Sequence, residues 1–198
     1  FFDMAKLYFR YGAMNSGKST ALMQVAHNYE EQGMRVLILK PKVDTKGSGD
    51  LVSRLGVRRP ADLLVPPDMD LVEAVRAASS EGRPLACVLC DESQFLTAEQ
   101  AEQLFMVTVE LNIPVICYGL RTDFKGELFP GSAELLATAD VIEEVKTICW
   151  CGKKATFNAR FEAAGKVLKE GEQVVLGAND KYIGLCRKHW KEGNLGPQ

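Results

Sequence analysis

The sequence predicts an α/β protein, in which a parallel β-sheet with helices on both faces precedes a small lobe rich in cysteine. Three observations support this prediction. An apolar strand pattern over Leu7–Tyr11 leads into a glycine-rich turn and then into a helical pattern. A second apolar run ends in the paired carboxylates Asp91 and Glu92. Two Cys/His pairs, with residues 152–185 between them, follow a change in composition near Thr147.

The chain length fits one main domain with a small appendage, because domains typically hold ~100 to 200 residues. Of its 198 residues we expect 4–146 to form the α/β domain and 147–192 the lobe. Residues 193–198 are expected to form a tail. Residues 1–3 precede Met4 and are expected to be an expression remnant.

Charge and hydropathy favour a small-molecule substrate. The 24 basic and 26 acidic residues give a net charge of −2, which provides no overall field to attract nucleic acid or a membrane. No apolar run approaches the ~20 residues that span a bilayer. The N-terminus lacks the charged-then-apolar order of a signal peptide. We therefore expect a cytoplasmic protein.

The glycine-rich turn fits G-x-x-x-x-G-K-[ST], the pattern of phosphate-binding loops (P-loops). Its glycines permit left-handed backbone conformations, so that successive N–H groups converge on an anion. Lys18 is expected to reach the terminal phosphates of ATP, and the Ser19 hydroxyl to hold Mg2+. The following helix points its positive end at the phosphates. The loop consists of Gly12, Ala13, Met14, Asn15, Ser16, Gly17, Lys18 and Ser19.

The next segments complete a parallel unit. Gly33 is expected to end the first helix, and residues 35–40 form an apolar run closed by Pro41. A strand, a helix and a second strand imply a right-handed crossover. Residues 44–60 are rich in glycine and charge, and we expect a mobile loop near the phosphates. Within it, Arg54 is expected either to contact phosphate or to remain solvated.

A helical pattern over residues 70–78 leads to the apolar run 85–90, which ends in the two carboxylates. This is the Walker B pattern, in which a buried strand delivers Asp91 to Mg2+. Adjacent residues at a strand end point to opposite sides, so Asp91 can face the metal and Glu92 a reacting group of the substrate. The alternative is that Glu92 merely tunes the metal site.

Thr97 and Gln100 fit a capping box and predict an amphipathic helix as far as Leu111. Further along the chain we expect a buried strand over 114–119, a loop over 121–131, a short helix capped by Ser132 and ending at Thr138, and an edge strand over 141–148.

The six cysteines fall into two classes. Three lie in apolar runs and are expected to be small buried hydrophobes: Cys87, Cys90 and Cys117. The other three lie among polar residues and turn signals, and with one histidine they form candidate zinc ligands: Cys149, Cys151, Cys186 and His189. A hairpin turn is expected at residues 164–166, between the two pairs. A surface cluster without metal is the alternative.

The chain resembles the type II thymidine kinases in the order of its motifs. These motifs are the P-loop, Asp91-Glu92-Ser93-Gln94-Phe95, Cys149-x-Cys151 and Cys186-x-x-His189. These are zinc-containing cytosolic enzymes related to human cytosolic thymidine kinase. The resemblance covers the chain from Met4 to about Trp190. It implies a P-loop NTPase-like (RecA-like) fold and transfer of the ATP γ-phosphoryl group, with Mg2+, to the thymidine 5′-hydroxyl. It also implies a structural zinc, a homotetramer and feedback inhibition by dTTP.

The resemblance assigns roles residue by residue. Glu92 falls on the catalytic base. Nucleotide contacts are implied for the P-loop and for Asp44, Thr45, Asp91, Glu92, Ser93 and Gln94. The thymine pocket is implied to comprise Met14, Phe95, Leu120, Phe124, Phe129 and Tyr182, with the backbone of Gln173, Val174, Val175, Leu176 and Gly177. Spacing alone would instead favour core packing for the aromatic residues of this set.

Two departures from the family pattern bear on the metal geometry: one residue separates the first zinc pair where many relatives have two, and His189 stands where many carry Cys. Two other functions remain open. One is a P-loop ATPase module whose zinc ribbon binds DNA, although the net charge and the absence of a basic run in the sequence oppose it. The other is a kinase for deoxycytidine or for several deoxynucleosides, which differs only in the pocket.

Overall fold

The computed structural model describes residues 3–43, 49–175 and 181–197. Within these residues, the largest sheet has six strands in the order β5-β2-β6-β7-β1-β8, and every neighbouring pair is parallel. The strands are β1 (Leu7–Tyr11), β2 (Arg35–Pro41), β5 (Leu63–Val65), β6 (Leu85–Cys90), β7 (Val115–Gly119) and β8 (Val141–Glu144). The predicted α/β fold with a parallel sheet is confirmed.

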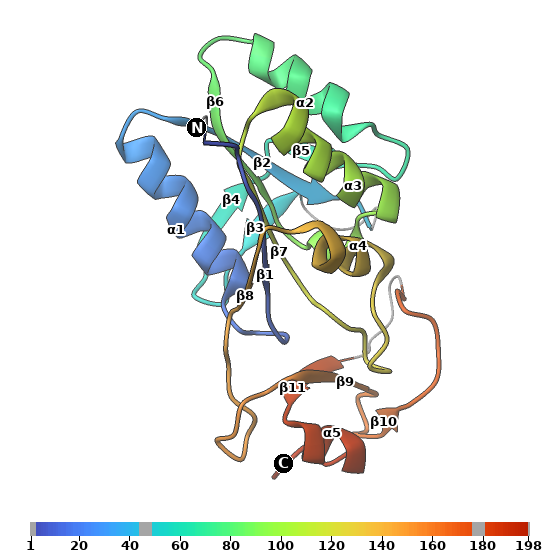
Figure 1. Cartoon of the computed structure of the whole chain (residues 1–198). Helices are drawn as coiled ribbons and strands as arrows, with labels where there is room; N and C mark the ends of the chain where they lie inside the picture. Colours follow the sequence, from blue (N-terminus) through green and yellow to red (C-terminus); the bar gives the residue numbers. More distant parts are fainter. Residues whose placement is uncertain (1–2, 44–48, 176–180, 198) are drawn as a thin grey trace.

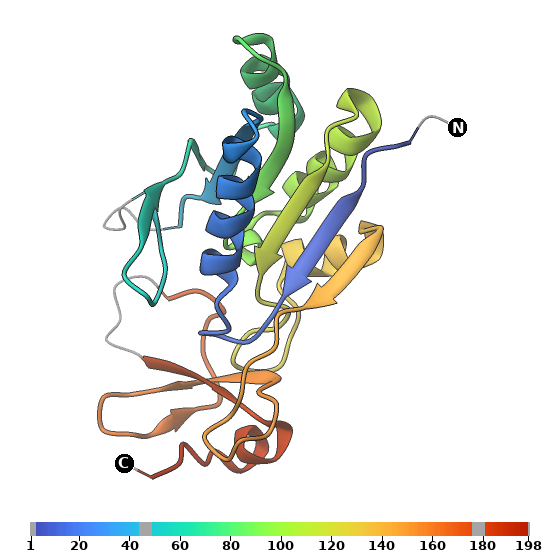
Figure 2. The ribbon, with the colours of Figure 1, turned by 90° about the vertical axis from the view of Figure 1, so that its left-hand side faces the viewer.

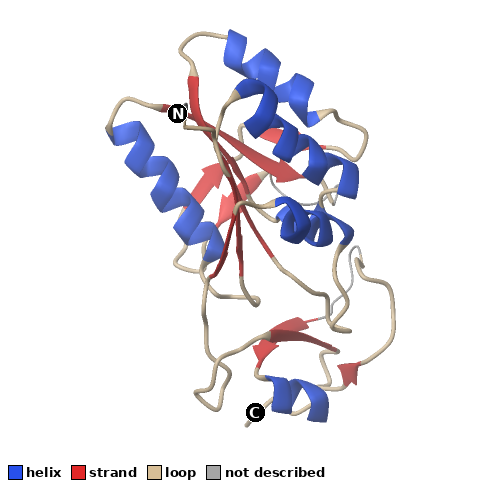
Figure 3. Ribbon diagram, in the orientation of Figure 1, coloured by secondary structure: helices blue, strands red, loops and turns tan. Residues whose placement is uncertain are grey.

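Helices cover both faces of this sheet (Figures 1 and 3). Helix α1 (Lys18–Glu31) lies on one face, and α2 (Leu71–Ser80), α3 (Ala98–Met106) and α4 (Pro130–Thr138) lie on the other. Figure 2 shows α1 in front of the strands and α2, α3 and α4 behind them. A π-helical turn, η2 (Val107–Leu111), continues α3. No helix among the described residues is long and apolar enough to cross a bilayer.

Strand β2 shows why the central strands read as continuous apolar runs. Leu37 and Leu39 pack into the core under α2, α3 and α4, whereas Val36 and Ile38 pack into the core under α1. A strand buried on both faces needs apolar side chains at every position, so its sequence does not alternate.

Local capping signals were partly predictive. The capping box of Thr97 and Gln100 is present, with both reciprocal hydrogen bonds formed. The prediction that Ser132 caps α4 is wrong, because that helix begins at Pro130. Proline at the first position of a helix has no backbone N–H, so that position has no donor for a cap to accept from. The Ser132 hydroxyl instead donates to the Leu120 carbonyl oxygen at 2.5 Å.

The segment predicted to be a mobile loop, residues 44–60, contains regular structure in its described part. Strands β3 (Asp50–Val52) and β4 (Arg58–Pro60) pair antiparallel as a hairpin. Leu51 is fully buried in the core under α1, which fixes the hairpin against the domain. Residues 44–48 lie outside the described part of the chain.

A second, smaller sheet forms the C-terminal lobe, with strand order β10-β9-β11. Its antiparallel strands are β9 (Phe157–Phe161), β10 (Val167–Leu168) and β11 (Lys181–Leu185), and helix α5 (Arg187–Glu192) follows. The predicted turn near Gly165 connects β9 to β10. The lobe lies beyond the ends of the central strands, next to the P-loop (Figure 1).

Candidate active site

A cavity of about 930 Å³ opens where β1, β6 and β7 end. Its volume is at the upper end of the range for small-molecule sites. It brings together segments far apart in the sequence: the P-loop, the end of β6, the loop after β7 and the lobe. The predicted site residues that line it are Met14, Asn15, Ser16, Gly17, Lys18, Ser19, Asp91, Glu92, Gln94, Phe95, Leu120, Phe129, Gln173, Val174, Val175 and Tyr182.

The P-loop has the backbone that anion binding requires. Asn15 and Gly17 have φ angles of 66° and 86°, both left-handed. Gly17 is the N-cap of α1 and has no side chain to satisfy the N–H groups of the first turn. Those groups and the helix dipole are therefore available to a phosphate in the cavity.

Lys18 lies over this loop. Its Nζ donates to the carbonyl oxygens of Gly12 at 3.0 Å and Ala13 at 2.8 Å, and to Ser16 Oγ at 3.2 Å. Burial lowers the pKa of Lys18 to about 8, although the charges of Asp91 and Glu92 oppose this shift. The three hydrogen-bond acceptors of this buried ammonium group are all uncharged, and a bound phosphate would provide a negatively charged partner.

Asp91 is 3% exposed and faces the start of α1. Its Oδ2 accepts a hydrogen bond from Ser19 Oγ at 2.7 Å, and its Oδ1 accepts one from the Glu92 N–H at 3.0 Å. Burial raises the pKa of Asp91, while the Ser19 hydrogen bond lowers it. An adjacent carboxylate and hydroxyl are the hard oxygen ligands that Mg2+ prefers, so Ser19 and Asp91 fit a magnesium site.

The backbone at Glu92 does not have the strand conformation that the sequence pattern predicts. Strand β6 ends at Cys90, and Glu92 has a left-handed backbone with φ of 48°. The two carboxylates therefore diverge through a backbone turn rather than through strand alternation. A non-glycine residue in this region costs on the order of 1 kcal/mol or more, and such strain is common at active sites.

The Glu92 side chain borders the cavity and is 44% exposed to it. Its Oε2 lies 3.9 Å from Lys40 Nζ. Burial raises the pKa of Glu92, and the Lys40 charge opposes that shift. A raised carboxyl pKa brings a general base closer to the pH at which it works.

Aromatic and apolar side chains form the other end of the cavity. The rings of Phe95 and Phe129 meet edge to face, with centroids 5.8 Å apart. Gln173 Nε2 donates to Asp123 Oδ2 at 3.0 Å, which fixes the segment that brings Val174 and Val175 to the cavity. A flat apolar ring with polar edges fits such a pocket.

Some predicted residues do not line the cavity. Phe124 is not among the lining residues: it is 3% exposed, and the Arg160 guanidinium lies 4.3 Å from its ring centroid. Ser93 is fully buried and donates to the Tyr118 carbonyl oxygen. Gly12 and Ala13, the first two residues of the P-loop, are not among the residues that line the cavity. Asp44, Thr45, Leu176 and Gly177 fall outside the described residues.

Other lining residues were missed by sequence reasoning. Val52, Ser53 and Leu55 reach the cavity because the hairpin after β2 folds over it. Only recognition of the short hairpin would have placed them there. Arg54 of the same hairpin also lines the cavity, so its contact with phosphate stays a prediction.

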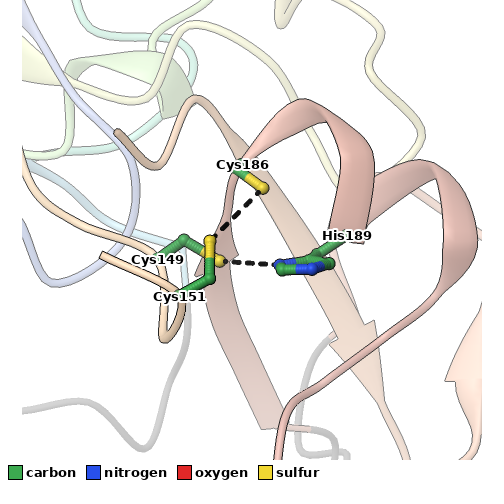
Figure 4. A group of neighbouring side chains, drawn as sticks. All are labelled: Cys149, Cys151, Cys186 and His189. Carbon is green, nitrogen blue, oxygen red and sulfur yellow. Dashed lines mark hydrogen bonds between the residues drawn. The ribbon is translucent and has the colours of Figure 1, made fainter. Parts of the chain in front are cut away.

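The four predicted zinc ligands form one cluster in the lobe (Figure 4). Cys149 Sγ lies 3.4 Å from His189 Nδ1, and Cys151 Sγ lies 3.9 Å from Cys186 Sγ. All four ligand atoms lie within 4.8 Å of one another. Tetrahedral zinc with Zn–S of ~2.3 Å and Zn–N of ~2.0–2.1 Å requires edges of ~3.8 Å between sulfurs and ~3.6 Å from sulfur to nitrogen. The two distances given above are close to these edges, and the chemistry of the Cys3His set fits Zn2+.

The short first pair is accommodated by a tight turn. The Cys149 N–H donates to the Lys153 carbonyl oxygen, and the Gly152 N–H donates back to the Cys149 carbonyl oxygen. Gly152 has φ of 82°, which a side chain would disfavour. One intervening residue is therefore enough to bring both thiols to the same point.

Comparisons with known proteins agree with this geometry. A family model described as thymidine kinase matches residues 5–190. A thymidine kinase of Ruegeria pomeroyi is 50% identical over 195 residues, covering 98% of each chain. A thymidine kinase of Salmonella typhimurium is 51% identical over 190 residues, which are 96% of this chain and 92% of that protein. One of Shewanella oneidensis is 50% identical over 190 residues, 96% of this chain and 98% of that protein.

Proposed function

The chain belongs to the thymidine kinase family, and we propose from this premise that it transfers the ATP γ-phosphoryl group to the 5′-hydroxyl of thymidine, giving dTMP. One observation carries the proposal: a single cavity is lined by a phosphate-binding loop, by an aromatic pocket and by Glu92. The reaction needs the donor, the base and the acceptor within reach of one another.

At the phosphate end, the N–H groups of the P-loop and the Lys18 ammonium bind the ATP phosphates and offset the charge that spreads over the transferring oxygens. Ser19 Oγ and Asp91 Oδ2 would hold Mg2+. When bound, that ion neutralises charge on the β- and γ-phosphates. The nucleotide contacts that fall on Asp44, Thr45, Ser93 and Gln94 are part of the same proposal.

At the acceptor end, the Glu92 carboxylate accepts the proton of the 5′-hydroxyl as phosphoryl transfer proceeds. Phe95, Phe129 and Leu120 enclose the thymine ring, and backbone groups of residues 173–177 bind its polar edge. Met14 and Tyr182 complete this pocket from the P-loop and from β11. Phe124 is part of the same proposal.

The zinc is proposed to be structural. Its four ligands lie outside the residues that line the active-site cavity, and they join two turns of the lobe. Closing a lobe in this way contributes to folding rather than to chemistry. The division into domains 4–146 and 147–192 has support from the separate apolar cluster of the lobe, which also takes in Ala13.

Further elements of the proposal rest on the family resemblance. We propose inhibition by dTTP, since one molecule carrying both a thymine ring and a triphosphate spans the two ends of the cavity. A homotetramer and a cytoplasmic location follow the same resemblance. The net charge of −2 supports a small-molecule acceptor over a nucleic acid or a membrane surface.

The test compares phosphorylation of thymidine, deoxycytidine, deoxyadenosine and deoxyguanosine by ATP and Mg2+, with Glu92→Gln as the inactive control. Thymidine should be the preferred acceptor. Equal turnover of deoxycytidine would indicate a broader deoxynucleoside kinase. ATP hydrolysis that DNA stimulates, without nucleoside phosphorylation, would indicate a DNA-binding ATPase and refute the proposal.

A further inference from the structure

The C-terminal lobe contacts the P-loop through strands β9 and β11. Asn158 Oδ1 accepts a hydrogen bond from the Met14 N–H at 2.8 Å, although 144 positions separate the two residues. Asn158 is 4% exposed. It lies opposite Gly184 in the register of the two strands, so both residues face the same side of the small sheet.

Gly184 provides a second, independent contact with the same turn of the P-loop. A Cβ atom added at Gly184 would lie 3.3 Å from Ala13 Cβ and 3.3 Å from the Met14 carbonyl oxygen. Glycine at this position lets the loop lie against the strand. Ala13 is itself buried in the apolar cluster of the lobe, beside Ala159 and Leu185.

These contacts act on the part of the P-loop that positions Lys18. The Lys18 Nζ donates to the carbonyl oxygens of Gly12 and Ala13, which immediately precede the N–H held by Asn158. The peptide between Ala13 and Met14 therefore serves both partners, its oxygen accepting from Lys18 and its N–H donating to Asn158. A shift of that peptide changes the position of the ammonium group.

We propose that Asn158 is a positioning residue for phosphate binding: with Gly184 it holds the first turn of the P-loop in its nucleotide-binding conformation. The lobe thus contributes to the ATP site as well as to the acceptor pocket. The inference rests on the proposed function only in taking ATP as the ligand of the P-loop.

Two variants test the contact from opposite strands. Asn158→Leu keeps the branching and the number of heavy atoms of the side chain but removes the acceptor. Gly184→Ala adds one methyl group against the loop backbone. Gln100→Leu is the matched control, because Gln100 is a buried amide that donates to Pro66 and Met69 and is not among the residues that line the cavity.

The primary readout is equilibrium binding of the non-hydrolysable ATP analogue AMP-PNP with Mg2+, measured calorimetrically on folded protein. Losing a hydrogen bond that leaves its donor unsatisfied is expected to weaken binding about tenfold in Asn158→Leu. Gly184→Ala should weaken it several-fold, and Gln100→Leu less than twofold. The KM for ATP should rise in parallel, and more than the KM for thymidine.

The second readout is hydrogen exchange of the Met14 amide by NMR, which should be slow in the wild type and in Gln100→Leu but faster in Asn158→Leu. Folded variants at both positions that bind AMP-PNP within twofold of the wild type would overturn the proposal. If Asn158→Leu fails to fold, Gly184→Ala decides alone. A wild type that binds AMP-PNP but never phosphorylates thymidine would refute the proposed function while leaving this inference standing.

Discussion

Raising the pH should inactivate the free enzyme through Lys18. Burial lowers the pKa of this lysine from 10.5 to about 8. The charged form is the one that binds phosphate, and kcat/KM for ATP reports the free enzyme. We therefore expect kcat/KM for ATP to fall as the pH rises through about 8, by about tenfold for each further pH unit.

Bound ATP should raise the pKa of Lys18, so that the loss of activity begins at a higher pH in the complex than in the free enzyme. The lowered pKa corresponds to a penalty of ~3 kcal/mol on the charged form of Lys18. One opposite charge at ~4 Å contributes ~4 kcal/mol at an effective dielectric constant of ~20, which is enough to offset that penalty. In the complex Lys18 should thus stay protonated. We therefore expect kcat to remain constant at pH values where kcat/KM for ATP has already declined.

The assay is initial rates of dTMP formation from pH 5 to 10, at saturating thymidine and with ATP varied at each pH. Burial raises the pKa values of Asp91 and Glu92, so both parameters should also decline at the acid end, as the pH falls through those raised values. Circular dichroism at each pH excludes unfolding as the cause. A kcat/KM for ATP that stays constant up to pH 9.5 would refute the reasoning. So would a kcat that falls at the same alkaline pH as kcat/KM.

Three further predictions concern the zinc cluster, the hairpin and the P-loop. Cys186→Ser removes one of the four clustered ligands. It should lower the zinc content below one per chain and lower the melting temperature, while turnover at 20 °C changes little. Wild-type protein that contains no zinc would contradict the site assignment. Leu51→Ala opens a cavity under α1 and should lower the free energy of unfolding by about 2–5 kcal/mol in urea titrations, whereas a change below 0.5 kcal/mol would indicate a loop that does not pack. Lys18→Ala should nearly abolish turnover with far-ultraviolet circular dichroism unchanged, and near-normal turnover would mean that the P-loop is only a structural turn.

Local signals in the sequence predicted local structure well. The P-loop, the capping box at Thr97 and the apolar strand β6 each depend on neighbouring residues, and all three form as predicted. The zinc cluster was also predictable, because each pair of ligands is local, one in the turn at Gly152 and the other at the start of α5, and only one long-range contact joins them.

Features fixed by distant partners were not predictable. The hairpin of Leu51 is held by α1 rather than by its own short strands, and polar composition alone indicated a loop. The left-handed backbone of Glu92 has no signature in its side-chain type. Asn158 and Asp123 find their partners 144 and 50 positions away, so nothing in their surroundings in the sequence marks them as part of the site.

The central claim is that the two adjacent carboxylates have separate roles, Asp91 as a magnesium ligand and Glu92 as the base. Single-turnover formation of dTMP by Asp91→Asn and Glu92→Gln across a magnesium titration tests it most directly. Glutamine keeps the shape of Glu92 but accepts no proton, so we expect a loss of roughly 100 to 10,000-fold, about 3 to 5 kcal/mol of barrier, that magnesium does not restore. Thymidine and ATP should still bind within a few-fold.

Asp91→Asn weakens a proposed metal ligand, whose Oδ2 accepts a hydrogen bond from Ser19 Oγ, so high magnesium should recover part of its rate. A Glu92→Gln enzyme that magnesium rescues, or an Asp91→Asn enzyme that it does not, would contradict the division of roles.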